Sequence, residues 1–286
     1  MITWYWVIRG IASFTATVGN TLVMILILRC RRLRVSIPNW YIFALALADM
    51  MVGAILTPCE FICTYWYSCD PYILRLTFDI IVHFSVTSLC AMTFERFMVI
   101  ARPLQYRDFM TKKRVLLILF SSWSFGAIFP ITGYICMAQQ KPVADKTLRI
   151  MNTIFLQILP PIMLMLVFIS MVYIANKHEK KERTQRNQLN YNYAGEEHKD
   201  RSRHIRDKAS VKMMGVVIIT FAICYMLAMF RSLYFYIMNR NIPITVTYIS
   251  RIMILVNSTV NFIVYAFLKK DFRQEIGRIF KAFISR

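Results

Sequence analysis

Stretches of about 20 mostly apolar residues recur along this chain of 286 residues, and they limit its fold more than any other feature. Each stretch has the length that an α-helix needs to cross roughly 30 Å of hydrocarbon. The hydrophobic share of 57% exceeds the roughly 45–50% typical of soluble domains, so the excess has to be hidden from water by a bilayer. We expect seven spans, at about residues 4–28, 39–64, 73–101, 115–137, 151–175, 213–238 and 243–267. The sequence therefore predicts an all-α integral membrane protein, a seven-transmembrane helix bundle.

The net charge of +20 is distributed unevenly among the segments between these spans. Residues 177–212 hold eleven of the 35 lysines and arginines, and the segments 29–36, 101–114 and 268–286 are also basic. The alternate segments carry few, which is the pattern of the positive-inside rule. We expect a multi-pass plasma-membrane protein with an extracellular N-terminus and a cytoplasmic C-terminus. Membrane lipid is an expected partner and nucleic acid is not, because the charge follows topology.

The chain is expected to form a single seven-transmembrane domain over residues 1–286, since no internal repeat of the kind found in transporters is visible. Residues 177–212 form the longest polar segment and are expected to be a cytoplasmic loop. In residues 269–286, apolar side chains recur at helical spacing with lysines and arginines between them. This pattern predicts a C-terminal amphipathic helix on the membrane surface, followed by a short tail.

One group of polar residues lies deep inside the predicted spans. Its members are Asp49, Ser85, Asn257, Ser258 and Asn261. A polar group in a membrane needs a partner away from water, and it is a functional hypothesis by default. Gathered together, these oxygen-bearing side chains would suit a sodium ion. The alternative is that they are hydrogen-bond links between helices.

A second group lies nearer the predicted outer face and contains Glu60, Arg75, Asp79, Arg231 and Arg251. Glu60 comes three helical turns after Asp49 and should share its inward face, and Arg75 can pair with Asp79 four residues later. Three arginines against two acids would leave a positive cavity suited to a carboxylate or phosphate. Internal ion pairs and arginines that reach toward the membrane surface are the alternative.

An enzyme inside the membrane is not expected. His83 is the one histidine within a predicted span, and no nucleophile with a base or set of metal ligands accompanies it. A transporter or channel would show repeats or a line of charges across the bilayer, whereas here the polar residues stop near Asp49. No cofactor is expected apart from the sodium ion.

The chain resembles the rhodopsin-like (class A) family of G-protein-coupled receptors over almost its whole length. The matching motifs are Gly19-Asn20, Asn39 with LALAD ending at Asp49, Ser85 with Leu89, Glu95-Arg96-Phe97, Pro103-Leu104 with Tyr106, Trp123, the FAIC of residues 221–224, the NFIVY of residues 261–265, and Phe272. Their order and spacing make the resemblance specific.

The resemblance implies a receptor that binds an extracellular ligand and activates a heterotrimeric G protein by helix rearrangement. It assigns coupling and switching to Glu95, Arg96, Phe97, Leu104, Phe221 and Tyr265. In the inactive state Arg96 would pair with Glu95. In the active state it would swing toward Tyr265, with Tyr173 as a further partner.

The resemblance also adds two residues to the ligand-binding group. Phe78 stands where amine receptors of the family carry an aspartate, and Tyr225 stands where the family has a tryptophan. A peptide or an anionic small molecule is therefore favoured over an amine. The seventh span has no lysine for a Schiff base, which argues against an opsin-like role.

Several positions depart from the family pattern. Leu227 and Phe262 replace prolines that bend the sixth and seventh helices, and their absence should straighten both helices. Cys63, Cys69 and Cys136 lie near the predicted outer face, where a disulfide could form. Pro71 stands at the family's usual third-span cysteine position, and the resemblance suggests a bond between Cys69 and Cys136 as the replacement for the family disulfide. These departures leave open a receptor-like protein with lost or constitutive signalling.

Overall fold

Backbone hydrogen bonding explains why the apolar runs of this chain are helical. Hydrocarbon offers no partner for N–H and C=O groups, so a spanning segment satisfies them internally as an α-helix. The computed structural model describes residues 3–189, 197–238 and 242–284, and these residues contain no β-strand. Within them, seven helical segments are long and apolar enough to cross a membrane, which confirms the predicted fold class. Those segments are Thr3–Arg29, Pro38–Tyr65, Pro71–Ala101, Lys112–Ala138, Val143–Lys181, Val211–Phe235 and Ile244–Leu268.

The helical elements follow one another along the chain with short connections. In order, they are α1 (Thr3–Arg29), α2 (Arg31–Val35), α3 (Pro38–Met51), η1 (Val52–Leu56), α4 (Thr57–Tyr65), α5 (Pro71–Ala101), α6 (Pro103–Phe109), α7 (Lys112–Ala138), α8 (Pro142–Asn152), η2 (Thr153–Ile158), α9 (Leu159–Leu189), α10 (Glu197–Met238), α11 (Ile244–Leu268) and α12 (Lys270–Ile284). The elements η1 and η2 are π-helical turns inside longer helices.

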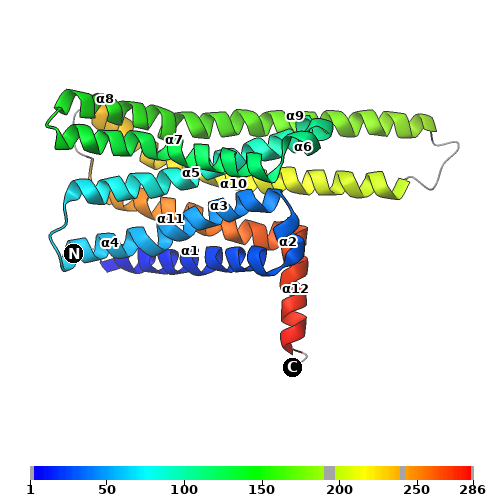
Figure 1. Ribbon diagram of the computed structural model, residues 1–286, viewed down its shortest axis with the longest axis horizontal. Helices are drawn as coiled ribbons and strands as arrows, with labels where there is room; N and C mark the ends of the chain where they lie inside the picture. Colours follow the sequence, from blue (N-terminus) through cyan, green and yellow to red (C-terminus); the bar gives the residue numbers. More distant parts are fainter. Residues whose placement is uncertain (1–2, 190–196, 239–241, 285–286) are drawn as a thin grey trace.

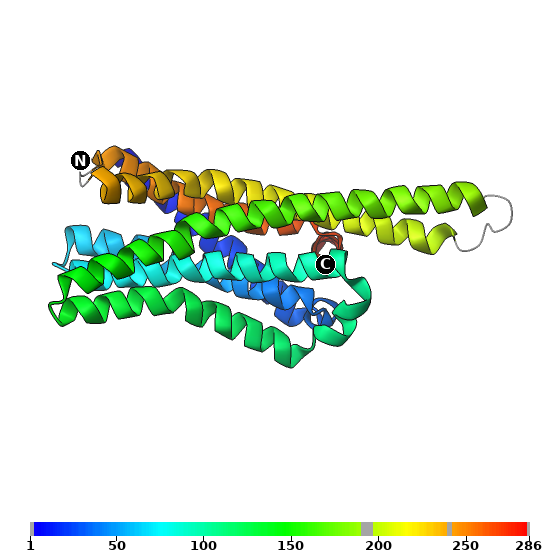
Figure 2. The same cartoon turned by 90° about the horizontal axis from the view of Figure 1, so that it is seen from above.

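The spanning helices lie side by side along the long axis of the molecule (Figure 1). We call its two ends the N-terminal end, where α1 begins, and the α12 end, where α12 leaves the bundle at a steep angle (Figure 1). The helix α5 packs against α3, α7 and α9, so it is the central helix of the bundle. Beyond the other spanning helices, α9 and α10 continue past the α12 end (Figure 2).

Each π-helical turn comes just before a proline. A proline lacks the N–H group and its ring clashes with the carbonyl group four residues earlier, and a wider turn at that place relieves the clash. For Pro58 that carbonyl belongs to Ala54 in η1, and for Pro160 it belongs to Leu156 in η2. In η1, Gly53 accepts a hydrogen bond at its carbonyl oxygen from Ser13 Oγ at 2.6 Å. The bulge thus brings α1 into direct contact with the second span.

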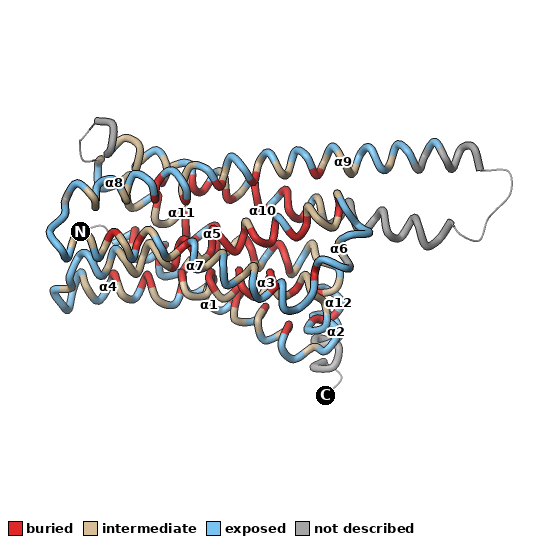
Figure 3. The backbone as a smooth tube through the Cα atoms, turned by 45° about the horizontal axis from the view of Figure 1, so that its top comes forward, coloured by how far each residue is buried: buried red, intermediate tan, exposed pale blue. Residues whose placement is uncertain are grey.

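The pattern of buried and exposed residues is that of a helix bundle whose outer surface faces hydrocarbon. The buried residues gather where the helices face one another, and the outer faces of the helices are exposed (Figure 3). Many exposed side chains in the spans are large and apolar, for example Phe14 at 71% and Phe120 at 74% exposure. The buried set includes polar residues such as Asn20, Asp49 and Asn261. An apolar surface around a partly polar interior is what a helix bundle in hydrocarbon requires.

The two replaced prolines leave uninterrupted helices. Both α10 and α11 are single α-helices without an internal proline or π turn. Phe262 on α11 packs against Gly19 of α1 so closely that a Cβ atom at Gly19 would lie 2.4 Å from the ring. The glycine therefore provides the space that the phenylalanine ring occupies.

The predicted disulfide between Cys69 and Cys136 is wrong. Cys69 is bonded to Cys63, and the thiol of Cys136 is free. Cys63 lies in the last turns of α4 and Cys69 in the connection to α5, so the short turn brings their Cα atoms to 5.3 Å. That separation falls inside the roughly 4.4–6.8 Å range of disulfides. This disulfide joins two cysteines that are six positions apart in the sequence, and it closes the loop between α4 and α5 at the N-terminal end.

Candidate functional site: a charged cavity and a buried arginine latch

A cavity of about 650 Å³ opens at the N-terminal end of the bundle, and we call it the N-terminal cavity. Its volume lies within the roughly 300–1,000 Å³ range of small-ligand sites. Its walls come from η1, α4, α5, α8, η2, α10 and α11. The charged side chains in its lining are Glu60, Arg75, Asp79, Arg231 and Arg251. All five members of the second polar group thus lie around one cavity.

Glu60 is shared between two arginines. Arg9 Nη1 lies 2.7 Å from Glu60 Oε2, and Arg251 Nη1 donates to Glu60 Oε1. The Tyr5 hydroxyl donates to the same Oε1 at 3.3 Å. Arg9 is only 1% exposed, and its Nε donates to Thr57 Oγ1 at 3.3 Å. Because a buried guanidinium is costly without a paired anion, Glu60 holds three spanning segments together at this end.

The other charges of the cavity are less fully paired. Arg75 Nε lies 3.6 Å from Asp79 Oδ2, and the Arg75 side chain is 50% exposed. The guanidinium of Arg251 also lies over the ring of Phe78, 5.6 Å from its centre. Arg231 forms no ion pair or hydrogen bond with any residue in the described part of the chain. Three arginines and two carboxylates leave the lining with an excess of one positive charge.

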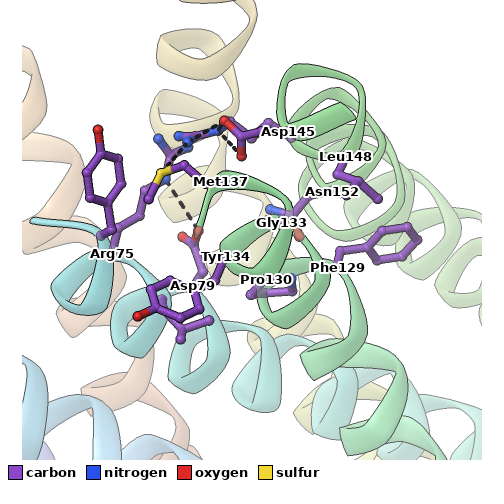
Figure 4. A pocket seen from close by; sticks show the side chains of 13 residues that line it. Arg75, Asp79, Phe129, Pro130, Gly133, Tyr134, Met137, Asp145, Leu148 and Asn152 are labelled. Atoms are coloured by element: carbon purple, nitrogen blue, oxygen red, sulfur yellow. Dashed lines mark hydrogen bonds and ion pairs between the residues drawn. The ribbon is translucent and has the colours of Figure 1, made fainter. Parts of the chain in front are cut away.

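A smaller cavity of about 40 Å³ lies beside the first, between α5, α7 and α8 (Figure 4). On one side Arg149 pairs with Asp145 through an Nη2–Oδ2 contact of 2.7 Å. Asn152 lines both cavities, and its buried Oδ1 has no hydrogen-bond partner within the described ranges. The space is about that of one water molecule. Asn152 thus presents a hydrogen-bond acceptor where the two cavities meet.

Tyr225 does not belong to the described lining of either cavity. Its side chain is 3% exposed and packs against Phe221, with ring centres 4.3 Å apart. Both residues lie on α10 one helical turn apart, so their rings meet inside the bundle. The structure therefore separates Tyr225 from the other proposed ligand-binding residues.

The deep polar group surrounds Asp49. Oδ1 of Asp49 accepts hydrogen bonds from Ser85 Oγ at 2.7 Å and from Ser258 Oγ at 2.9 Å, and Oδ2 accepts one from Asn261 Nδ2 at 2.7 Å. Asp49 is fully buried, so these three donors replace water around it. Asn257 is buried one turn before Asn261, but it makes no hydrogen bond to Asp49. Its Oδ1 has no partner among the residues described.

Glu95 and Arg96 lie at the α12 end of α5. Arg96 Nε is 3.2 Å from Glu95 Oε2, and the Tyr106 hydroxyl donates to Glu95 Oε1 at 2.6 Å. Glu95 is 0% exposed and Arg96 is 9% exposed. The carboxylate thus joins its neighbouring arginine to α6, where Tyr106 lies. The Arg96–Glu95 contact is an ion pair without hydrogen-bond geometry, because Glu95 Oε2, Arg96 Nε and Arg96 Nη2 are buried and have no hydrogen-bond partner in the described part of the chain.

The other predicted switch residues differ in exposure. Phe221 and Tyr265 are buried, and the Tyr265 hydroxyl lies 3.7 Å from Met92 Sδ. Phe97 packs against the core, while Leu104 is 88% exposed. Tyr173 is 65% exposed and makes no hydrogen bond to Arg96 within the described residues.

Lys269, just after α11, adds a charge to this end of the bundle. Its Nζ donates to Asn39 Oδ1 and lies over the ring of Phe272. Burial, and then the positive charge of Arg96, lower the pKa of Lys269 to about 7. The carboxylates of Asp271 and Glu95 oppose that shift. Lys269 is therefore near its titration point close to neutral pH.

Sequence reasoning missed three of these residues. Arg9 lies inside the first predicted span and belongs to no motif, yet it is buried against Glu60, 51 positions away. Asn152 and Lys269 have no motif around them. The one usable signal was Arg9 itself, because an arginine one turn or two inside an apolar span usually has a buried partner.

Comparison with known proteins places the chain in a family. Residues 19–265 match the 7 transmembrane receptor (rhodopsin family). The chain is 26% identical over 308 residues to the octopamine receptor beta-2R of Chilo suppressalis, covering 90% of this chain and 74% of that receptor. It is 24% identical over 303 residues to the adenosine receptor A3 of Ovis aries, covering 97% of this chain and 90% of that receptor.

A shorter match covers 43% of the chain and 28% of the alpha-2B adrenergic receptor of Rattus norvegicus, at 29% identity. The family match spans most of the chain and includes every motif between Gly19 and Tyr265. The protein is thus a multi-pass plasma-membrane receptor and not an enzyme, and the chain belongs to the rhodopsin family of seven-transmembrane receptors.

Proposed function

We propose that this receptor binds a ligand with an anionic group in the N-terminal cavity and responds by activating a heterotrimeric G protein. The observation that carries the proposal is Arg231. It lines the 650 Å³ cavity and has no acidic partner in the described part of the chain. A carboxylate or phosphate would supply the missing charge through a bidentate contact.

The distribution of basic residues supports the orientation that this function needs. The positive-inside rule assigns the α12 end, with its basic connections, to the cytoplasm. The N-terminal cavity would then face the outside, and Glu95 and Arg96 would face the cytoplasm. An external ligand and an internal G protein would meet opposite ends of the same helices.

Activation would proceed through a shift between two helix arrangements. A ligand moves such an equilibrium only by as much as it prefers one arrangement over the other. In the resting arrangement Arg96 is paired with Glu95, and Tyr106 holds Glu95. In the active one, Arg96 would leave Glu95 and turn toward Tyr265. Leu104, which is 88% exposed, would contact the G protein.

A sodium ion is a further proposal for the group around Asp49. The residues fit such an ion, because Asp49, Ser85 and Ser258 gather hard oxygen atoms and Asn257 has a buried Oδ1 without a partner among the described residues. Asp49 would supply the negative charge, and Asn261 would orient it. Bound sodium would stabilise the arrangement in which these helices are close together.

The relatives suggest a second ligand class. The names of two matched proteins refer to octopamine and adenosine, neither of which is an anion at neutral pH. Of the two carboxylates in the cavity lining, Glu60 is already shared between Arg9 and Arg251, so an amine would have to use Asp79. That carboxylate already has Arg75 beside it at 3.6 Å, so an amine would have to compete with an arginine. We therefore place the anionic ligand first.

The test is a G-protein activation assay in cells, with a panel of G-protein sensors and ligand pools divided into acidic peptides, small anions, amines and nucleosides. Loss of the charged contact in Arg231→Gln should weaken the response to an anionic ligand roughly 10- to 150-fold, from about 1.5–3 kcal/mol. Lys141→Gln removes an exposed cation at the same end, outside the cavity lining, and serves as the matched control.

Arg96→Ala should abolish the response while surface expression is retained. A response to amines that Arg231→Gln leaves intact and Asp79→Asn abolishes would replace the anionic proposal with the amine. Absence of ligand-dependent and basal activity with every G protein would favour a receptor-like protein that does not signal.

A further inference from the structure

The N-terminal end of the bundle holds more positive than negative charge around its cavity. The arginines gathered there are Arg9, Arg75, Arg231 and Arg251, and the carboxylates that contact them are those of Glu60 and Asp79. Glu60 is shared between Arg9 and Arg251, and Asp79 lies one helical turn from Arg75 on α5 (Figure 4). Four arginines and two carboxylates leave an excess of two positive charges. A guanidinium group keeps its proton in proteins, so titration cannot remove this excess.

The protein has no further carboxylate for these arginines among the described residues of this end. The acidic residues of the helices and connections there are Glu60, Asp70, Asp79 and Asp145. Asp145 Oδ2 lies 2.7 Å from Arg149 Nη2, and exposed Asp70 caps α5 by accepting from the Tyr72 N–H group at 2.8 Å. An anion that balances the excess therefore has to come from solution.

Arg231 on α10 and Arg251 on α11 are the two arginines between which such an anion fits. The helices α10 and α11 pack against each other, and both arginines line the N-terminal cavity. Of the charged groups around Arg231, Arg251 acts on it most strongly, ahead of Asp79. Like charges repel each other more as the surrounding dielectric constant falls. A small anion held between the two guanidinium groups would turn this repulsion into attraction.

Both guanidinium groups have donors available for an anion. A guanidinium carries five N–H donors, and Glu60 accepts from one of those of Arg251. Arg231 makes no hydrogen bond or ion pair within the described ranges. The side chain of Arg251 is 31% exposed and Arg231 is partly exposed. A small ion can therefore reach both side chains through the cavity.

The lining favours a small monovalent anion over a more strongly hydrated one. Guanidinium groups are themselves weakly hydrated, and they direct several N–H donors toward one acceptor. Leu56, Leu74 and Ile244 line the same cavity, so an ion there loses part of its water shell next to apolar side chains. That loss costs more for a doubly charged phosphate than for a halide. Chloride is the abundant small anion outside cells, the side that the cavity faces in the proposed orientation.

We propose that a chloride ion occupies the N-terminal cavity of the resting receptor between Arg231 and Arg251, and that the anionic ligand displaces it. The ion would hold α10 and α11 together at this end while no ligand is bound. Only the displacement rests on the proposed function, because the excess charge is present without a ligand. Chloride and the ligand would use the same donors, so each would weaken the binding of the other.

Thermal unfolding of the full-length receptor in detergent tests the ion directly. Sodium chloride is compared with sodium gluconate at equal concentration, which keeps the sodium around Asp49 and the ionic strength constant. With a dissociation constant near 10 mM, about 150 mM chloride should raise the apparent Tm by roughly 3–6 °C. The chloride-35 NMR line should also broaden when the receptor is added. A receptor that shows neither effect would overturn the proposal.

Three variants locate the ion. Arg231→Gln should remove most of the chloride-dependent rise in Tm and most of the line broadening. Arg251→Lys keeps a positive charge beside Glu60 but loses the fork of donors, and it should weaken chloride binding several-fold. Lys141→Gln removes an exposed cation outside the cavity lining and should behave like the unmodified receptor. Equal chloride effects in Arg231→Gln and Lys141→Gln would show that the ion binds elsewhere and would refute the site.

The G-protein activation assay tests displacement with the pool of acidic peptides. Replacing gluconate with about 150 mM chloride outside the cells should raise the half-maximal peptide concentration roughly 10- to 20-fold for the same dissociation constant. A peptide response that chloride leaves unchanged would overturn the displacement. Chloride binding in the absence of a response to any anionic pool would refute the proposed ligand class and leave the ion site standing, so the two failures are distinguishable.

Discussion

Replacing Glu60 with glutamine would leave Arg9 and Arg251 without the carboxylate that they share. The side chain of Arg9 is 1% exposed and that of Glu60 is 11% exposed, so water cannot replace the lost anion around Arg9. The substitution keeps the shape of the side chain and one acceptor oxygen. It therefore tests the charge and leaves the packing nearly intact.

The expected loss can be estimated from the burial of the pair. Breaking a buried ion pair by removing one partner costs about 3–5 kcal/mol, because an uncompensated charge remains. For a chain of this size, with roughly 2–4 °C per kcal/mol, the apparent Tm should fall by roughly 6–20 °C. Asp79→Asn is the matched control. The Arg75–Asp79 contact is 3.6 Å long and half exposed at Arg75, so its loss should cost under about 1 kcal/mol.

Thermal unfolding of the purified receptor in detergent, followed by fluorescence of a thiol-reactive dye, measures both variants under identical conditions. In a double-mutant cycle, adding Arg9→Met to Glu60→Gln should recover part of the lost Tm, since it removes the buried charge that was left without a counter-charge. If Glu60→Gln lowers Tm no more than Asp79→Asn does, the reasoning that Glu60 is a buried counter-charge for Arg9 is refuted.

Three other substitutions test separate parts of the structure. Tyr106→Phe removes the hydroxyl that donates to buried Glu95 at 2.6 Å, which should destabilise the resting arrangement by about 1.5–3 kcal/mol. Basal signalling in a G-protein sensor assay should rise, and an unchanged basal level would contradict this role. Gly19→Ala places a Cβ atom 2.4 Å from the ring of Phe262 and should destabilise the receptor by about 1–3 kcal/mol in thermal unfolding. In the double variant, Phe262→Ala should remove most of the clash penalty from Gly19→Ala, whereas additive losses would count against the contact. Because the pKa of Lys269 falls to about 7 in the folded protein, the unfolded chain binds more protons between about pH 7 and 10.5. Stability should therefore rise with pH across that window and stay flat below it. Lys269→Met should flatten the rise in Tm measured from about pH 6 to 10, and an unchanged slope would exclude this group as its source.

The fold class followed from the sequence because hydrocarbon leaves a chain few choices. Seven apolar runs of sufficient length had to become helices, and the structure confirms them within its described residues. Short-range relations were also accessible, as with Arg75 and Asp79, which lie four residues apart and are paired. The disulfide shows the limit of this reasoning, because the choice between Cys63 and Cys136 as the partner of Cys69 depends on where a loop turns.

Sequence motifs alone did not predict which of the listed residues come together in the candidate site. The group around Asp49 could be listed from the sequence, but its hydrogen bonds show that Ser258 faces the carboxylate and Asn257 does not. Tyr225 occupies a position matched to the family, yet its ring packs beside Phe221 outside the cavity. Such differences depend on helix rotation by a fraction of a turn, which apolar periodicity in a membrane hardly constrains.

The sequence by itself determined that this protein spans a membrane with seven helices, that its basic residues follow a topological pattern, and that its motifs are those of the rhodopsin family. Tertiary structure alone decided that Arg9 reaches Glu60, that Arg231 is left unpaired among the described residues, and that a cavity forms between α5, α7 and α9. The physical reason is the distance along the chain over which each effect acts. Hydrophobic length and local spacing act along a single helix, whereas ion pairs and crevices depend on how separate helices are rotated and tilted against one another.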